Sequence, residues 1–112
     1  MSKRGDQEFL NDIDIAIKNI LEYVKGMTFD DFIKDKKTQD AVVRNLEIIG
    51  EAVKNLSKAF IAKHKDIEWK QIAGMRDKVV HFYFGVNWDI VWNVVLNKLP
   101  ELKGKIYYLL ED

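Results

Sequence analysis

An arginine, a histidine and a tyrosine at fixed intervals are the residues of this chain with the clearest chemical potential. They are Arg76, His81 and Tyr83, and they lie within an otherwise apolar helical stretch. The guanidinium of arginine is a permanent, forked positive charge that suits a phosphate, and histidine can take and give a proton near neutral pH. Together the two groups can cleave RNA without a metal ion.

The arginine and histidine pair has low specificity when taken alone, because both types are common on helix surfaces. His81 is surrounded by apolar residues, among which an unpartnered charge would be costly, so any polar group there must be satisfied. A core histidine bonded to a backbone carbonyl would satisfy the same requirement. The residue types alone therefore favour a structural role over a catalytic one.

Composition limits the classes of function that remain. The 18 Lys and Arg residues balance the 18 Asp and Glu residues among 112, so no global positive field attracts nucleic acid and any RNA contact must be local. Without cysteine and with two histidines, disulfides and thiolate or histidine-rich metal sites are not expected. Residues 1–7 lack the apolar core of a signal peptide, and no run approaches the roughly 20 apolar residues of a membrane span. We expect a cytoplasmic protein with no metal and no cofactor.

Helical periodicity runs through the whole chain and places the motif on a helix. Apolar residues at intervals of three and four predict a first helix over 6–25, stopped by Gly26, and a long helix over 36–63. Thr28 and Asp31 form a capping box for a short turn, and Asp35 or Thr38 can cap the long helix.

The second half of the chain is expected to hold the remaining helices. A short turn over 69–72 precedes a core helix over 75–84, and Asn87 with Asp89 caps a fourth helix that Pro100 kinks or follows with a new segment. With one proline and no low-complexity tract, residues 1–112 are expected to form a single domain. The predicted fold is an all-α, up-down bundle of four to five helices.

A polar cluster on the long helix has two interpretations. Arg44, Glu47 and Glu51 share one face, because positions 44 and 51 are about 20° apart on an ideal helix. They form either an exposed ion-pair ladder or a group that reaches the arginine and histidine segment. Gly50, on the same helix, is expected to allow another helix or a ligand to come close. His64 is assigned no function.

These segments in combination resemble the HEPN superfamily, specifically the HepT-type toxins. The resemblance lies in the Arg44 to Ala52 segment, in Trp69 leading to Gly74-Met75-Arg76, in the stretch from Val80 to Phe84, and in Val91-Trp92 with Leu99-Pro100. The hallmark of the family is arginine, four variable residues, histidine, one variable residue and tyrosine. The residue after the arginine is usually asparagine in this branch and here is Asp77, which keeps the acceptors but loses the amide donor.

The resemblance implies a HEPN-like dimeric fold and a homodimeric, metal-independent endoribonuclease. It would be the toxin of a type VII-like toxin–antitoxin pair, with a small nucleotidyltransferase antitoxin that can transfer AMP to Tyr83. His81 would move a proton as the RNA 2′-hydroxyl attacks the adjacent phosphorus, and Arg76 would stabilise the charge on the phosphoryl oxygens. The possible auxiliary residues are Asp77, Lys78, Arg44, Glu47 and Glu51.

Helical geometry adds a constraint to this site. Five residues along a regular helix leave Arg76 and His81 about 140° apart around the axis, whereas Tyr83 lies within about 20° of Arg76. Either the helix ends or distorts near His81, with Gly85 close by, or the site combines groups from two chains across a two-fold axis. We favour the second.

Two alternatives to the nuclease remain. One is a catalytically inactive, dimeric HEPN-like binding module that regulates or scaffolds a nucleotidyltransferase partner. The intact Arg76 and His81 argue against it. The other is a purely structural helical protein in which His81 is a satisfied core residue.

Overall fold

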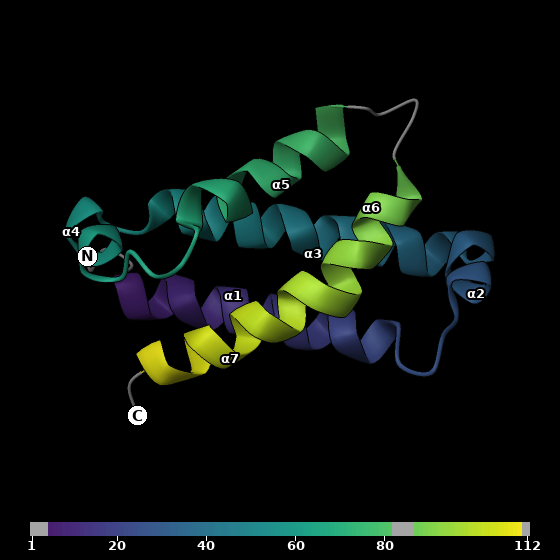
Figure 1. The fold of residues 1–112 in the computed structure, drawn as a ribbon, viewed down its shortest axis with the longest axis horizontal. Coiled ribbons are helices and arrows are strands. Elements are labelled where there is room, and N and C mark those ends of the chain that lie inside the picture. The colour runs from purple at the N-terminus through teal and green to yellow at the C-terminus, as the bar shows by residue number, and fades with distance from the viewer. Residues whose placement is uncertain (1–4, 82–86, 111–112) are drawn as a thin grey trace.

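The computed structural model describes the backbone of residues 5–81 and 87–110, and the side chains of 5–75 and 87–110. Every regular element in this part of the chain is helical. The elements are α1 (Asp6–Tyr23), α2 (Phe29–Lys34), α3 (Lys36–Asn55), α4 (Lys58–Lys63), α5 (Trp69–His81), α6 (Trp88–Asn93), the π-helical turn η1 (Val94–Lys98) and α7 (Leu99–Leu109). The long elements α1, α3, α5 and α6–α7 run in alternating directions (Figure 1). The all-α, up-down fold is confirmed.

The core lies between the antiparallel helices α1 and α3, with α7 packed across α1. Most of its fully buried side chains come from the apolar stripes of these helices, as the spacing predicts, and Phe32 of α2 joins them. The largest of them are Leu10, Ile13, Ile17, Ile20, Phe32, Leu46, Ile49, Leu99 and Ile106. The apolar periodicity of the sequence therefore identifies the faces that hold the bundle together.

The local signals around α2 produce the expected turns and caps. Gly26 has a φ of 77°, in the left-handed region that favours glycine, and the chain turns there after α1. The Thr28 hydroxyl accepts from the Asp31 N–H at 3.1 Å and the Asp31 carboxylate accepts from the Thr28 N–H at 3.0 Å, which completes the capping box. Asp35, rather than Thr38, caps α3 by accepting from the Thr38 N–H at 3.1 Å.

The expectation of one helix over 36–63 is wrong, because α3 ends at Asn55 and α4 begins at Lys58. Leu56 is buried in an extended conformation. Ser57 then caps α4 by accepting from the Phe60 N–H at 3.1 Å, while Asp6 of α1 accepts from both the Ser57 N–H and the Ser57 hydroxyl at 2.7 and 2.8 Å. The capping contacts of a serine, not a change in apolar spacing, break the helix.

The expectation of a turn over 69–72 and a separate helix from residue 75 is also wrong. A single helix, α5, runs from Trp69 through Gly74 to His81. Trp69 is buried at its start and its indole N–H donates to the His64 carbonyl at 2.9 Å. A glycine within a helix costs about 1 kcal/mol relative to alanine, which packing can offset, so Gly74 does not interrupt α5.

The last helical segment contains the expected irregularity at Pro100. Proline lacks an N–H and its ring would clash with the carbonyl four residues back in a regular helix. In η1 the Leu99 N–H bonds the Val94 carbonyl, five residues back, and Pro100 follows in the first turn of α7. The wider π turn lets α6, η1 and α7 continue in one direction past the proline.

Candidate active site

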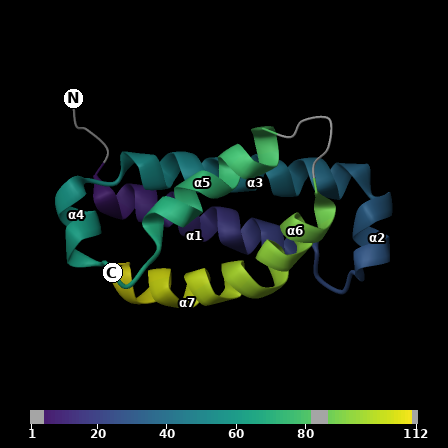
Figure 2. The same cartoon turned by 45° about the horizontal axis from the view of Figure 1, so that its top comes forward.

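Helix α5 carries the predicted catalytic residues on its C-terminal half. Arg76 and His81 lie on a continuous helical backbone, whereas Tyr83 lies outside the described residues. Asp77 and Lys78 lie on the same half of the helix. Helix α5 packs against α3, and its C-terminal end points toward the side of the molecule where α6 begins (Figures 1 and 2). The bundle therefore fixes the helix on which the motif is carried.

An aromatic cluster fixes the start of α6, on the other side of residues 82–86. The ring of Phe32 in α2 is fully buried and stacks on Trp92 at 4.9 Å between centroids, and it meets the edge of Trp88 at 5.7 Å. The Asn87 side chain caps α6 by accepting from the Asp89 and Ile90 N–H groups at 3.1 and 3.3 Å. The chain is therefore anchored in the bundle both before and after residues 82–86.

A cleft of about 350 Å³ lies between α5 and the α6–η1–α7 segment. Its apolar lining includes Leu46, Ile72 and Met75, and polar groups such as Gln71 and Lys98 also line it. Met75 is the residue before Arg76, so the cleft reaches the start of the motif. The sequence signal for this helix face is the recurrence of Trp69, Ile72 and Met75 every three residues, and a turn over 69–72 would not form the cleft.

The described backbone keeps the angle expected between the two predicted catalytic residues. Because α5 is helical as far as His81, the directions of Arg76 and His81 from its axis differ by about 140°. A distortion before His81 does not occur. The other alternative is that the helix ends just after His81, and it concerns residues outside the described ranges.

The polar cluster on α3 lies in a different hollow. Arg44, Glu47 and Glu51 line a groove of about 520 Å³ that also includes Phe9 and Asp12 of α1. The Arg44 guanidinium lies 3.8 Å from the Glu47 carboxylate, and the Arg44 side chain is 72% exposed. Such exposed pairs contribute little to stability.

Within one chain, this groove and the α5 cleft lie on different sides of α3. Arg44 is about 160° around α3 from Leu46, the side chain that lines the cleft beside α5. The contact between the Arg44 cluster and the motif, which the sequence left open, stays a prediction, because the side chains of Arg76 and His81 lie outside those that the structure describes.

The described residues contain neither a metal-binding cluster nor a membrane-spanning helix. Among the side chains of residues 5–75 and 87–110, no three or more His, Cys, Asp or Glu groups are placed so as to hold a metal ion. Within the same ranges, no helix has the length and apolar character needed to cross a membrane.

Comparison with known proteins places the chain in a family. The family model described as "Ribonuclease HepT-like" matches residues 13–109. A Methanocaldococcus jannaschii protein named "Putative RNase" is 48% identical over 112 residues, covering all of this chain and 93% of the relative. A Caldanaerobacter subterraneus subsp. tengcongensis protein named "Putative RNase" is 53% identical over 92 residues, 82% of each chain. The "Probable ribonuclease HepT" of Thermococcus cleftensis is 48% identical over 103 residues, covering 92% of this chain and 94% of the relative. No solved structure gives a significant match. The chain therefore belongs to the ribonuclease HepT-like family.

Proposed function

We propose that this ribonuclease cleaves RNA without a metal ion, and that it is the toxin of a toxin–antitoxin pair. The observation that carries the proposal is the family match over residues 13–109, which includes the whole of α5 with Arg76 and His81 at the motif spacing. The proposed unit is a single domain of residues 1–112 that acts in the cytoplasm.

The proposed reaction uses the RNA's own 2′-hydroxyl as nucleophile. His81 takes the proton of that hydroxyl as its oxygen attacks the adjacent phosphorus. The bond from phosphorus to the 5′-oxygen breaks, and a proton returns to that oxygen. The products are a 2′,3′-cyclic phosphate and a 5′-hydroxyl. Arg76 stabilises the negative charge that develops on the phosphoryl oxygens.

A homodimer would solve the geometric problem of α5. Arg76 and His81 occupy positions about 140° apart around the axis of one straight helix, and such positions do not face the same phosphate. Two α5 helices related by a two-fold axis would place Arg76 of one chain beside His81 of the other. Asp77 and Lys78, which follow Arg76 on the same helix, are proposed auxiliary residues.

The proposed antitoxin is a small nucleotidyltransferase that binds the toxin and transfers AMP to Tyr83. Tyr83 follows His81 by two residues, so a modified side chain there would be close to the path of the RNA. A bulky AMP group with a phosphate charge would obstruct that path and repel the RNA backbone. Arg44, Glu47 and Glu51 remain auxiliary candidates that would act across the dimer.

A cleavage assay in the presence of a chelator tests the proposal. Wild-type protein should cut RNA, and Arg76→Ala and His81→Ala should each lower the rate at least a hundredfold, as expected for loss of a charge-stabilising or proton-transferring group. Lys37→Ala, an exposed change at the start of α3, is the matched control and should cut at the wild-type rate. Circular dichroism should show that all three variants are folded. Cleavage that disappears with the chelator would overturn the metal-independent mechanism.

A further inference from the structure

A short stretch of the chain departs from its overall charge balance. Residues 52–65 contain four lysines and one histidine and no acidic residue, although the whole chain has 18 residues of each sign. The lysines are Lys54, Lys58, Lys63 and Lys65, and we call them the basic surface. A local excess of positive charge is the form of RNA contact that a neutral chain allows.

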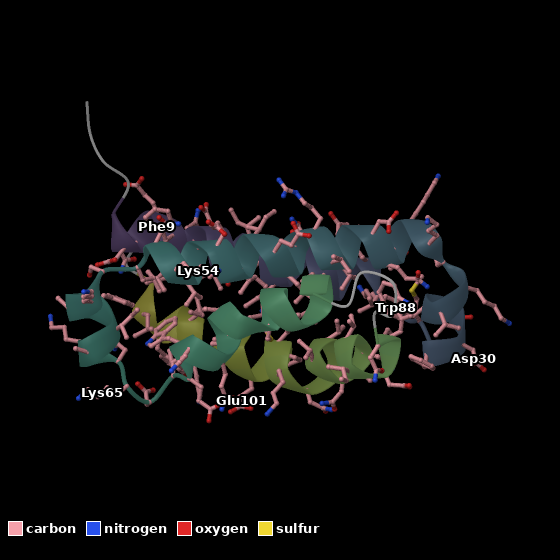
Figure 3. The ribbon with its side chains drawn as sticks, turned by 90° about the horizontal axis from the view of Figure 1, so that it is seen from above. Phe9, Asp30, Lys54, Lys65, Trp88 and Glu101 are labelled. Atoms are coloured by element: carbon pink, nitrogen blue, oxygen red, sulfur yellow. The ribbon has the colours of Figure 1, made fainter. Side chains whose placement is uncertain are left out.

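All four lysines of the basic surface are exposed. They lie on α4, on the last turn of α3 and just after α4, and Figure 3 shows Lys54 and Lys65 toward the same end of the molecule. Within residues 5–75 and 87–110, none of the four makes an ion pair, whereas Lys18, Arg44 and Lys105 each do. Within the described bundle, their ammonium groups are therefore not held in close ion pairs with acidic side chains.

Aromatic rings accompany the basic surface. Phe60 of α4 contacts the His64 ring at 4.6 Å and the Trp69 ring at 6.0 Å between centroids. On α7, Tyr107 and Tyr108 meet edge to face at 5.4 Å and are 71% and 84% exposed. Exposed rings beside lysines are the combination that binds single-stranded RNA, because bases stack on the rings while lysines contact the phosphates.

Hydrogen bonds hold these parts at one end of the bundle. Ser57, which caps α4, bonds to Asp6 of α1, and Gln7 of α1 donates to the Leu109 carbonyl at the end of α7 at 2.9 Å. The Lys105 ammonium group lies 3.4 Å from the Asp66 carbonyl and joins α7 to the turn after α4. Figures 1 and 2 show α4 and the C-terminal end of α7 at this same end.

Helix α5 leads from the basic surface to the proposed catalytic residues. It begins at Trp69, four residues after Lys65. At 1.5 Å per residue, Arg76 is about 10 Å and His81 about 18 Å along the helix from Trp69. An RNA strand that lies along α5 with its cleaved bond near His81 would reach the basic surface within a few nucleotides.

We propose that the basic surface is a second RNA-binding site, which holds the phosphates of the substrate away from the bond that is cut, with Tyr107 and Tyr108 as stacking platforms for its bases. This proposal rests on the ribonuclease function proposed above. The exposed tyrosines favour RNA over an acidic protein as the occupant, because base stacking uses them and charge pairing alone does not.

A salt titration of RNA binding tests the basic surface. The variant changes Lys58→Gln, Lys63→Gln and Lys65→Gln together, and the matched control changes Lys34→Gln, Lys36→Gln and Lys37→Gln, which are exposed lysines at the junction of α2 and α3. Every protein also carries His81→Ala so that a 30-nucleotide single-stranded RNA stays intact, and anisotropy reports its binding.

Loss of three phosphate contacts should reduce the slope of log affinity against log salt by about 2, since each contact on a single strand contributes about 0.7. Between 50 and 200 mM salt, the affinity of the unmodified surface should therefore fall about twentyfold more than that of the variant. The control should keep the original slope. Equal slopes for variant and control would overturn the proposal and would leave an acidic protein as the occupant to test.

Cleavage rates separate this proposal from the ribonuclease proposal. With His81 intact, the lysine variant should cleave a trinucleotide as fast as wild type and should show a raised KM, with an unchanged kcat, only on the long RNA. Tyr107→Ala with Tyr108→Ala should weaken binding of the long RNA severalfold without changing the salt slope, because stacking is not ionic. A wild-type protein that cleaves neither RNA would refute the ribonuclease mechanism, whereas equal KM values on the long RNA would refute the second site alone.

Discussion

Replacing Phe32 with alanine should destabilise the bundle strongly and should loosen the start of α6. The Phe32 side chain has no exposed surface and contacts both Trp92 and Trp88. Removing a buried phenylalanine typically costs about 3–5 kcal/mol, from lost burial and from the cavity that remains. We expect a destabilisation within this range, because the Phe32 ring joins α2 to α6 and neither helix exceeds two turns.

The expected change in melting temperature follows from the size of the chain. At about 2.1 cal/mol/K per residue, a chain of this length has an unfolding entropy near 0.24 kcal/mol/K. A loss of 3–5 kcal/mol then lowers Tm by about 13–21 °C. Urea denaturation followed by circular dichroism measures the free energy directly, and the dependence on urea should be unchanged if the unfolded state is unaffected.

Phe29→Ala provides the matched control on the same short helix. Phe29 is half-buried and contacts Trp92 at 6.1 Å, so its loss should cost less than half as much as that of Phe32. A double-mutant cycle between Phe32 and Trp92 should give a coupling of about 0.5–1.5 kcal/mol. A cost below about 1.5 kcal/mol for Phe32→Ala, or equal costs for both phenylalanines, would refute the claim that this ring anchors α6.

Three further predictions concern the site and its caps. Mixing Arg76→Ala chains with His81→Ala chains under conditions that exchange subunits should restore up to a quarter of wild-type cleavage. Half the dimers would be mixed, and each mixed dimer would have one intact site of its two. No recovery of cleavage would place both residues of a site in one chain. Tyr83→Phe should abolish AMP transfer by the partner and spare RNA cleavage, as radiolabelled ATP would report, and equal labelling of the variant would rule out this tyrosine. The Thr28 N–H lowers the pKa of Asp31, and the Thr38 N–H lowers the pKa of Asp35, below the ordinary value of 3.8. The stability that these two carboxylates contribute is therefore present above pH 3.8 and is lost as the pH falls through the lowered pKa values. An NMR titration between pH 6 and 2 should show both carboxyls titrating below 3.8, and values at or above it would contradict the capping account.

The elements of the fold were predictable where local chemistry and apolar spacing agree. Gly26, the Thr28 capping box and the Asn87 cap each act within four residues, so the sequence alone reveals them. The break at Ser57 was not predictable in the same way. Its main partner is Asp6, which is 51 residues away, and no local pattern announces that contact. The expected break at Gly74 was wrong because α5 as a whole packs against α3, and helix propensity does not describe that packing.

The sequence proposes the residues of the site more readily than it describes their surroundings. The family resemblance, rather than spacing alone, marks Arg76 and His81 as catalytic. The structure places both on one helix, and their catalytic role stays a prediction. The cleft before Met75 arises from the angle between α5 and the α6–α7 segment, and that angle is set by tertiary packing. The separation of the Arg44 cluster from the cleft likewise depends on which side of α3 receives α1 and which receives α5, a choice that periodicity leaves open.

Analysis of the ends that cleavage produces tests the central claim most directly. Wild-type protein should be incubated with a defined RNA and an excess of chelator, and the fragments identified by mass. If the 2′-hydroxyl attacks with the help of His81 and Arg76, the fragments should carry a 2′,3′-cyclic phosphate and a 5′-hydroxyl, and an RNA with a 2′-deoxy residue at the cut position should resist. Fragments with a 5′-phosphate and a 3′-hydroxyl, or cleavage of the 2′-deoxy RNA, would contradict the mechanism.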